Sequence, residues 1–342
     1  SHIHDENYGG GALDVGFRRA LETHQMFNFP ANYHLSGTLL AAIKWAVTDN
    51  STHEKQLQDG PAFLEFLTLF VDHDQHDGRP GALVGGVFAE HMMPYFEGPC
   101  NAMTIDRFTD VMQAYFGLAP SDVQVMHVPE RVIRSTTTGM APLTGRTFAD
   151  IAASDYTATY LDEVNHLHFW FYPGETPWAG FKPGEAGIDT TIGEQTYQHK
   201  VHKVNGVHCF MINDREDNSK FWTQDDGLRI DTRYTLLEKA RHNDQAQITV
   251  IFDDWEAYAG RSFTDPQGND NYLLWHKTAR WLAMHPWIHV ITLKDALAMA
   301  RADEAAWVID HGAVTDKEPS TYEWLRHACK DHVSNPKQSY DN

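Results

Sequence analysis

The stretch VQVMHVPERV (123–132) decides the fold class, because a run of β-forming residues ends directly in a carboxylate, Glu130. The segment before it, TIDRFTDVMQAYFG (104–117), has the apolar spacing of an amphipathic helix. A helix that leads into a short apolar strand is typical of parallel sheets with crossover helices. The same alternation recurs on both sides of this stretch.

Six further runs of the same kind occur along the chain. They are NYHLSG (32–37), ALVGGVF (82–88), TATYLDEV (157–164), VHCFMIN (207–213), QITVIFDD (247–254) and WIHVITL (287–293). Seven runs favour an α/β barrel over a short open sheet, and 342 residues are enough for one barrel with insertions. We predict one catalytic domain over 1–315, with rim insertions such as 173–206, and a helical C-terminal extension over 316–342.

Composition restricts the classes of partner. The chain has 27 basic and 47 acidic residues and a formal charge of −20, so its field repels nucleic acid and anionic membranes. Ten Trp and thirteen Tyr exceed the needs of a core and indicate an aromatic-lined cleft for a neutral substrate. Cys100, Cys209 and Cys329 form no disulfide framework or metal knuckle, which favours a reducing, cytoplasmic location. The oligomeric state cannot be predicted.

Several strand candidates end in acidic or polar residues, and the carboxyl ends of barrel strands converge where active sites form. Glu130 is followed by Arg131, whose guanidinium can keep a nucleophilic carboxylate ionised. Asp254 ends the run QITVIFDD, and Glu256 follows two positions later; crowded carboxylates raise one another's pKa, as a general acid requires. Each of these residues has a simpler interpretation as a helix cap or surface ion pair.

Four segments in this order, NYHLSGTLL, GGVFAEHMMPYF, VMHVPERV and VIFDDWEAYAG, resemble the conserved segments of glycoside hydrolase family 57. The resemblance extends from His2 to about residue 298 and is strongest to the 4-α-glucanotransferase and α-amylase-like branch. It implies a distorted (β/α)7-type barrel and a retaining mechanism on α-glucosidic bonds, with no metal and no cofactor.

The resemblance also implies roles for individual residues. Glu130 matches the nucleophile and Asp254 the general acid/base. The residues expected to bind substrate are His2, His4, His34, Glu90, Arg131, Asp162, Trp255 and Glu256. Either water or a sugar hydroxyl can accept the glycosyl group, which gives hydrolysis or transfer.

The sequence departs from the family pattern at three places. Asp5 and Glu6 stand where Gln-Pro usually follows the first His-x-His, and Val132 and Ile133 stand where a Trp is common. The segment between Glu256 and Gly260 is one residue longer than usual. Sugar and linkage specificity are therefore less determined than the fold.

Two other classes of protein remain open at this point. Twenty-one His residues allow a metal-dependent hydrolase, either a polysaccharide deacetylase-like enzyme or a zinc glycosidase. The candidate ligands for such an enzyme are His2, His4, His34, His91, His166 and His168. A non-catalytic carbohydrate-binding barrel is the third possibility, because the departures lie close to Asp254.

Overall fold

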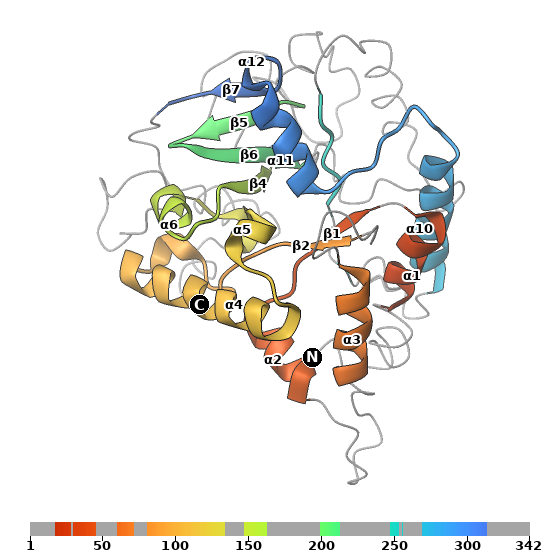
Figure 1. Cartoon of the computed structure of the whole chain (residues 1–342), viewed down its shortest axis with the longest axis horizontal. Helices are drawn as coiled ribbons and strands as arrows, with labels where there is room; N and C mark the ends of the chain where they lie inside the picture. The colour runs from red at the N-terminus through yellow and green to blue at the C-terminus, as the bar shows by residue number, and fades with distance from the viewer. Residues whose placement is uncertain are drawn as a thin grey trace, which may run out of the picture.

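A series of parallel strands runs through the middle of the molecule (Figure 1). The computed structural model describes residues 18–28, 30–45, 60–71, 81–133, 147–162, 199–212, 247–252, 255 and 269–312. The predicted C-terminal extension and the residues His2, His4, Asp254 and Glu256 lie outside these ranges.

Five strands follow one another in chain order, each parallel to the one before. β1 (Ala31–Tyr33) pairs with β2 (Gly81–Leu83), and Gly85, just after β2, bridges to Met126 in β3 (Val125–Met126). β3 pairs with β4 (Ala158–Asp162), which pairs with β6 (Val207–Ile212). Ile212 then bridges to Val250, so a sixth segment continues the series.

These strands and the bridge at Val250 overlap six of the predicted runs. The seventh prediction, a strand over 287–293, is wrong, because the chain there forms no ladder and leads into a helix. It does approach β1, where the Leu293 amide donates to Asn32 Oδ1 over 3.0 Å. Within the described ranges the strands form two sheets and not a closed barrel, so closure stays a prediction.

Two strands were not predicted. β5 (Val201–Val204) is antiparallel to β6, and β7 (Val308–Asp310) runs parallel to β5. Asn205 and Gly206 join β5 to β6 with positive φ angles of 50° and 83°, the conformation of a tight hairpin turn. The long polar segment 173–206, predicted as a rim insertion, thus ends in a hairpin strand.

Helices connect the parallel strands and surround them. They are α1 (Arg18–Phe27), α2 (Gly37–Trp45), α3 (Gly60–Phe70), α4 (Gly98–Phe116), α5 (Pro120–Val123), α6 (Thr147–Ala153), α10 (Asn269–Ala283), α11 (Leu293–Ala302) and α12 (Glu304–Trp307), with short 3-10 turns η3 (Met93–Tyr95) and η4 (Pro129–Arg131). The amphipathic spacing at 104–117 correctly predicted α4. None of the described helices combines the length and the apolar character needed to cross a bilayer.

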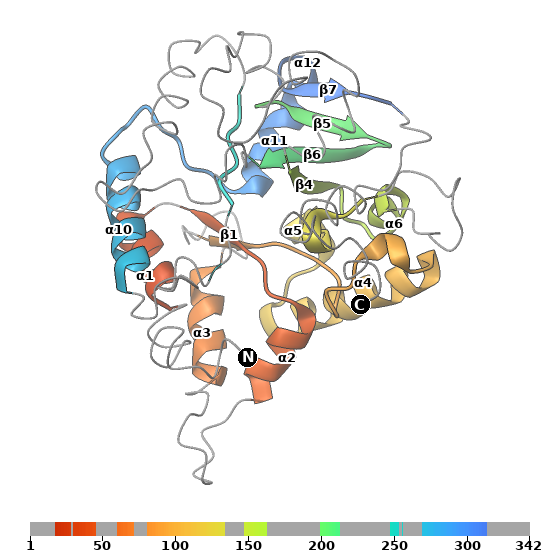
Figure 2. The same ribbon diagram turned by 180° about the vertical axis from the view of Figure 1, so that it is seen from behind.

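The parallel strands β3, β4 and β6 are buried on both faces, which explains why their sequences are continuous apolar runs. Tyr160 and Phe210 on one face pack with α11 residues such as Leu297. Leu161 and Met211, one position further along, belong to the larger core that includes α4 and α6. Figure 2 shows the sheet from behind, with α4 and α6 below it and α11 across it. This arrangement leaves the strand ends as the place where polar side chains gather.

Candidate active site at the strand ends

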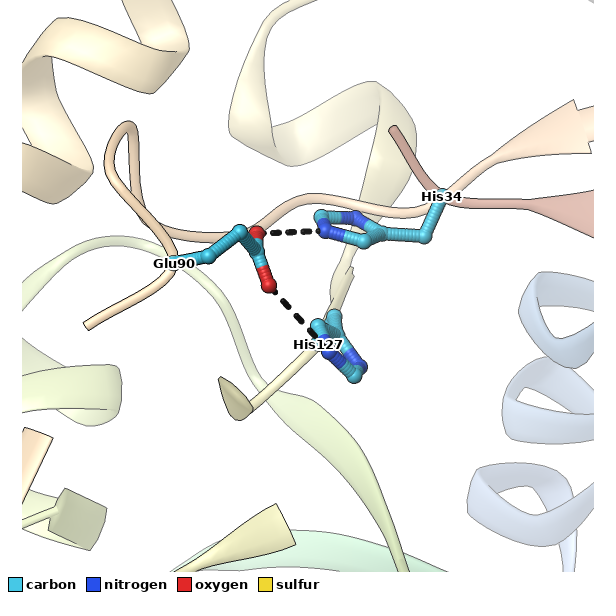
Figure 3. Close-up of side chains that lie close together, drawn as sticks. All are labelled: His34, Glu90 and His127. Atoms are coloured by element: carbon cyan, nitrogen blue, oxygen red, sulfur yellow. Dashed lines mark hydrogen bonds and ion pairs between the residues drawn. The ribbon is translucent and has the colours of Figure 1, made fainter. Parts of the chain in front are cut away.

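Three polar side chains meet at the carboxyl ends of neighbouring parallel strands. His34 follows β1 directly, His127 follows β3 directly, and Glu90 lies in the segment after β2. We call this set the strand-end cluster. In Figure 3 the Glu90 carboxylate reaches between the two imidazole rings. Sequence reasoning predicted His34 and Glu90 as neighbours in a cleft but did not include His127.

Both ring nitrogens of His34 face acceptors. Nε2 lies 2.8 Å from Glu90 Oε1, and Nδ1 lies 3.3 Å from the Val84 carbonyl oxygen. The ring stacks on Phe108 with centroids 5.7 Å apart. On the remaining side it lies against Gly86, where a Cβ would come within 2.4 Å of His34 Cε1. Gly86 is therefore required for this ring position.

His127 is held by the neighbouring strand. Its Nδ1 lies 2.7 Å from the hydroxyl oxygen of Tyr160 in β4, and its Nε2 lies 3.6 Å from Glu90 Oε2. Burial lowers the pKa of His127 well below its usual value, and the electrostatic influence of His34 and Arg131 lowers it further. His127 is consequently neutral at neutral pH, with a lone pair on one ring nitrogen.

The segment that carries Glu90 is tied to two helices. The Phe88 amide donates to the Thr104 carbonyl in α4, and the Phe88 carbonyl accepts from the Thr38 amide in α2. Beside Glu90, His91 donates from Nε2 to Asn101 Oδ1 over 2.9 Å. Asn101 in turn donates to Asp150 Oδ2 over 2.8 Å. The Glu90 carboxylate is thus presented from a fixed segment, although about a third of its side chain is exposed.

Glu130 lies at the end of β3 on an unusual backbone. It has φ 50° and ψ 13°, and Arg131 has φ 52°, so two successive residues with Cβ atoms occupy the left-handed region. Each such residue costs about 1–3 kcal/mol, and this kind of strain concentrates at functional sites. Glu90 shares the feature, with φ 52°. The Glu130 side chain is exposed, so its carboxylate is available to a ligand.

Aromatic side chains from the C-terminal half reach the same region. The Arg131 guanidinium lies 5.0 Å above the Phe252 ring, and Phe252 is 5.5 Å from the Tyr160 ring. Trp255 packs on Tyr33 of β1, with centroids 4.6 Å apart. Phe252 and Trp255 are the described residues on either side of positions 253 and 254. Both therefore contact residues next to the strand-end cluster.

The structure describes only some of the other predicted site residues. The backbone of Asp162 ends β4. His91 is bonded to Asn101 and lies outside the strand-end cluster. His166 and His168 lie outside the described ranges, as do His2, His4, Asp254 and Glu256. Their roles stay predictions.

His127 had no local signal that would have singled it out, because its partners Glu90 and Tyr160 lie 37 and 33 residues away in the chain. It also lies inside the apolar run, where a histidine is most simply interpreted as a residue of the strand. The useful hint was its position directly before Val128 and Pro129, at the end of β3.

Comparison with known proteins shows a similarity of fold. Neither a protein-family model nor a curated protein matches the sequence. A GH57 branching enzyme from Thermococcus kodakaraensis, solved in complex with glucose and additives, matches with a TM-score of 0.54 and 10% identity over 90% of this chain and 68% of that one. A 4-α-glucanotransferase from Thermococcus litoralis matches with a TM-score of 0.53 and 14% identity over 89% of this chain.

A third solved structure, an exo-type maltose-forming amylase from Pyrococcus sp. ST04, matches with a TM-score of 0.51 and 13% identity over 86% of this chain. This chain spans only 38% of the glucanotransferase and 42% of the amylase. The mixed α/β fold with parallel strands is therefore shared with these carbohydrate-active enzymes.

Proposed function

We propose that this protein is a retaining glycoside hydrolase or transglycosidase that acts on the α-glucosidic bonds of an α-glucan or maltooligosaccharide. The observation that carries the proposal is Glu130, an exposed carboxylate on a strained backbone at the end of β3. Ligands of parallel α/β folds bind at the carboxyl ends of the strands, where this residue lies. The fold similarity to a 4-α-glucanotransferase and a GH57 branching enzyme supports the same class.

In this proposal Glu130 attacks the anomeric carbon while protonated Asp254 donates its proton to the leaving oxygen. Asp254 then removes a proton from the incoming water or sugar hydroxyl, which releases the sugar from Glu130. A retaining mechanism requires the two carboxyl groups to be about 5–5.5 Å apart. The contacts of Phe252 and Trp255, which flank the Asp253–Asp254 pair, support an approach of this kind.

The remaining predicted residues bind the sugar in this proposal. His34 and Glu90 offer a hydrogen-bonding pair to sugar hydroxyls, and Trp255 offers an aromatic surface. Arg131, next to Glu130 in the chain, also binds the sugar. His2, His4, Asp162 and Glu256 complete the cleft, and the substrate is neutral, as the chain's charge of −20 suggests.

The test is incubation with maltooligosaccharides of defined length, followed by analysis of the products. We expect shorter products from hydrolysis or a ladder of longer and shorter chains from transfer. Glu130→Gln and Asp254→Asn should each lower turnover by at least about 10³-fold, because each removes half of a two-carboxylate mechanism. Azide should restore cleavage to the Glu130 variant only. Oligosaccharide binding without products, or near wild-type turnover in either folded variant, would contradict the proposal.

A metal-dependent hydrolase is the second candidate, and the strand-end cluster is the observation that favours it. Two imidazoles and one carboxylate form a common ligand set of catalytic zinc sites. Treatment with a chelator separates the two functions. A carboxylate pair still cleaves maltooligosaccharides after the metal is removed, whereas a metal-dependent hydrolase loses all turnover until zinc is restored.

A further inference from the structure

We propose that the strand-end cluster binds a divalent transition-metal ion, with Zn²⁺ as the preferred ion. The ligands are His34 Nε2, one oxygen of Glu90 and His127 Nε2. The ligating atoms of these three residues all lie within 4.8 Å of one another. The three ligands come from the ends of β1 and β3 and from the segment after β2, so they belong to a rigid scaffold and not to one mobile loop.

The spacing of the ligand atoms suits tetrahedral coordination. With metal–ligand bonds of about 2.0–2.2 Å, neighbouring ligand atoms of a tetrahedral zinc site are roughly 3.3–3.5 Å apart. The distance between His127 Nε2 and Glu90 Oε2 is already 3.6 Å. The distance between His34 Nε2 and Glu90 Oε1 is 2.8 Å and must lengthen by roughly half an ångström as the ion replaces the hydrogen bond.

Each imidazole has a partner on the nitrogen that faces away from Glu90. The Val84 carbonyl oxygen lies 3.3 Å from His34 Nδ1, and the Tyr160 hydroxyl oxygen lies 2.7 Å from His127 Nδ1. Metal-binding histidines almost always donate their second N–H to such an oxygen, which fixes the tautomer and the ring orientation. Both rings can therefore carry their proton on Nδ1 and direct the lone pair of Nε2 to the ion.

The contacts of His34 also favour a cation on chemical grounds. Two acceptors, Val84 O and Glu90 Oε1, face its two ring nitrogens, but a neutral imidazole has only one N–H to donate. An ion bound at Nε2 contacts the Glu90 carboxylate directly and leaves the single N–H for Val84. The same ion neutralises a carboxylate that otherwise lies between two imidazoles.

Of the three side chains in the cluster, Glu90 is the most exposed. The exposed fraction is 10% for the His127 side chain and 15% for that of His34, but it is 32% for Glu90. Solvent therefore reaches the cluster past Glu90, while Phe108 and Tyr160 lie behind the rings. Three protein ligands leave the fourth tetrahedral position for water or a sugar hydroxyl on this open side.

The ligand set also indicates which ions will bind. Imidazole nitrogen favours Zn²⁺, Co²⁺, Ni²⁺ and Cu²⁺, whereas Mg²⁺ and Ca²⁺ prefer sites made only of oxygen. Two imidazoles and one carboxylate should discriminate strongly against Mg²⁺ and Ca²⁺. This selectivity distinguishes a specific metal-binding site from the general attraction of cations to an acidic protein.

The experiment is a titration of the chelator-stripped, tag-free protein with Zn²⁺ by calorimetry, in the absence of sugar. We expect one tight equivalent that Mg²⁺ does not displace. Glu90→Gln and His127→Asn should each weaken this equivalent by at least about 100-fold, while His289→Asn, which removes an exposed histidine, should not change it. Gly86→Ala keeps every ligand but displaces the His34 ring, so we expect a loss of at least about tenfold.

Wild-type protein provides a second measurement that does not depend on folding of the variants. Co²⁺ bound in the same site should give the intense visible absorption of a four-coordinate ion, and zinc-edge X-ray absorption should detect two imidazoles. A tight equivalent that persists unchanged in folded Glu90 and His127 variants would overturn the proposal, as would the absence of any tight equivalent. Because no sugar is present, either result is independent of the proposed glycosidase activity.

Discussion

Among the described residues, histidines meet at two places, at the ends of β1 and β3 and between β5 and β7. At the first place His34 and His127 converge on an accessible carboxylate, Glu90, whose own backbone is strained. At the second, His202 is fully buried and stacks on His311, with a 2.8 Å hydrogen bond between their rings. The first group faces a region that a ligand can reach, and the second connects two strands.

Position in the sheet explains the difference. At the ends of parallel strands the backbone leaves the ladder, so side chains such as His34 are available for a ligand. β5 and β7 flank the sheet as added strands, and His202 and His311 bond to each other there. Glu304 of α12 accepts from Lys203 in β5 and from His208 in the neighbouring β6. The same residue type therefore lies at strand ends beside an accessible carboxylate in one region and joins two strands in the other.

The largest effect expected from this comparison is that His34→Ala lowers turnover, whereas His202→Ala lowers the free energy of unfolding. The His34 variant should lose about tenfold to hundredfold in maltooligosaccharide turnover, because a hydrogen-bonding group of the proposed cleft is removed. The His202 variant should lose about 2–4 kcal/mol in free energy of unfolding, because a cavity forms and His311 loses a partner.

Steady-state kinetics and urea unfolding of both variants provide the measurement. The folded His202 variant should retain turnover, and the His34 variant should retain most of its stability. Equal losses of turnover in the two variants would remove the distinction between the two regions.

Tyr160→Phe tests whether a side chain of the sheet supports His127 in the strand-end cluster. Tyr160 is buried, and its hydroxyl contacts His127 Nδ1. Removal of the hydroxyl leaves a buried imidazole nitrogen without that partner, so we expect the free energy of unfolding to fall by about 1–3 kcal/mol. Tyr115→Phe is a matched control at a partly exposed ring of α4, and it should change stability by less than about 0.5 kcal/mol. Equal unfolding midpoints for the two variants would show that the Tyr160 hydroxyl does not support His127.

The smallest expected effect is a dependence of stability on pH that arises in the β5–β7 region. Burial lowers the pKa of His208; the Glu304 carboxylate opposes this shift, and the positive charges of Arg301 and Lys203 add to it. The unfolded chain takes up this proton near pH 6.5 and the folded chain only at lower pH. Stability is therefore complete above about pH 6.5 and falls as the pH is lowered from there.

His311 contributes in the same direction, because burial lowers its pKa, although the nearby Asp310 opposes the shift. Each group can contribute up to about 1.4 kcal/mol per pH unit, and His311, which is partly exposed, contributes less. Urea midpoints at pH 7.5, 6.0 and 5.0 provide the measurement. His208→Gln should flatten the decline, and an unchanged slope in that variant would contradict the assignment.

Much of the sheet could be predicted because its parallel strands are buried on both faces. β4 and β6 lie inside the runs TATYLDEV and VHCFMIN, whose apolar residues fill both cores. β5 and β7 were missed since VHKV and VID are short and carry polar side chains. The Asn205–Gly206 turn was a readable hairpin signal that we did not use.

The candidate site was harder to predict than the sheet. The segments that contain His34 and Glu90 predicted both as substrate-binding residues. His127 joins them only through the pairing of distant strands, which no local sequence pattern encodes. The strained backbone of Glu130 also has no sequence signal, since the left-handed region is normally occupied by glycine or asparagine. Asp254 lies outside the described residues, so the carboxylate pair itself stays a prediction.

The contact between Asn32 and the Leu293 amide has a consequence for biosynthesis. These residues are separated by 261 positions, so β1 leaves the ribosome long before the chain that borders it. At about 5–20 residues per second, the delay is roughly 15–50 s. During this time β1 can pair with β2, but its other side has no neighbour from the C-terminal half. A nascent chain stalled before residue 293 should therefore expose β1 to chaperones and proteases, and this edge becomes covered only when the segment leading into α11 has emerged.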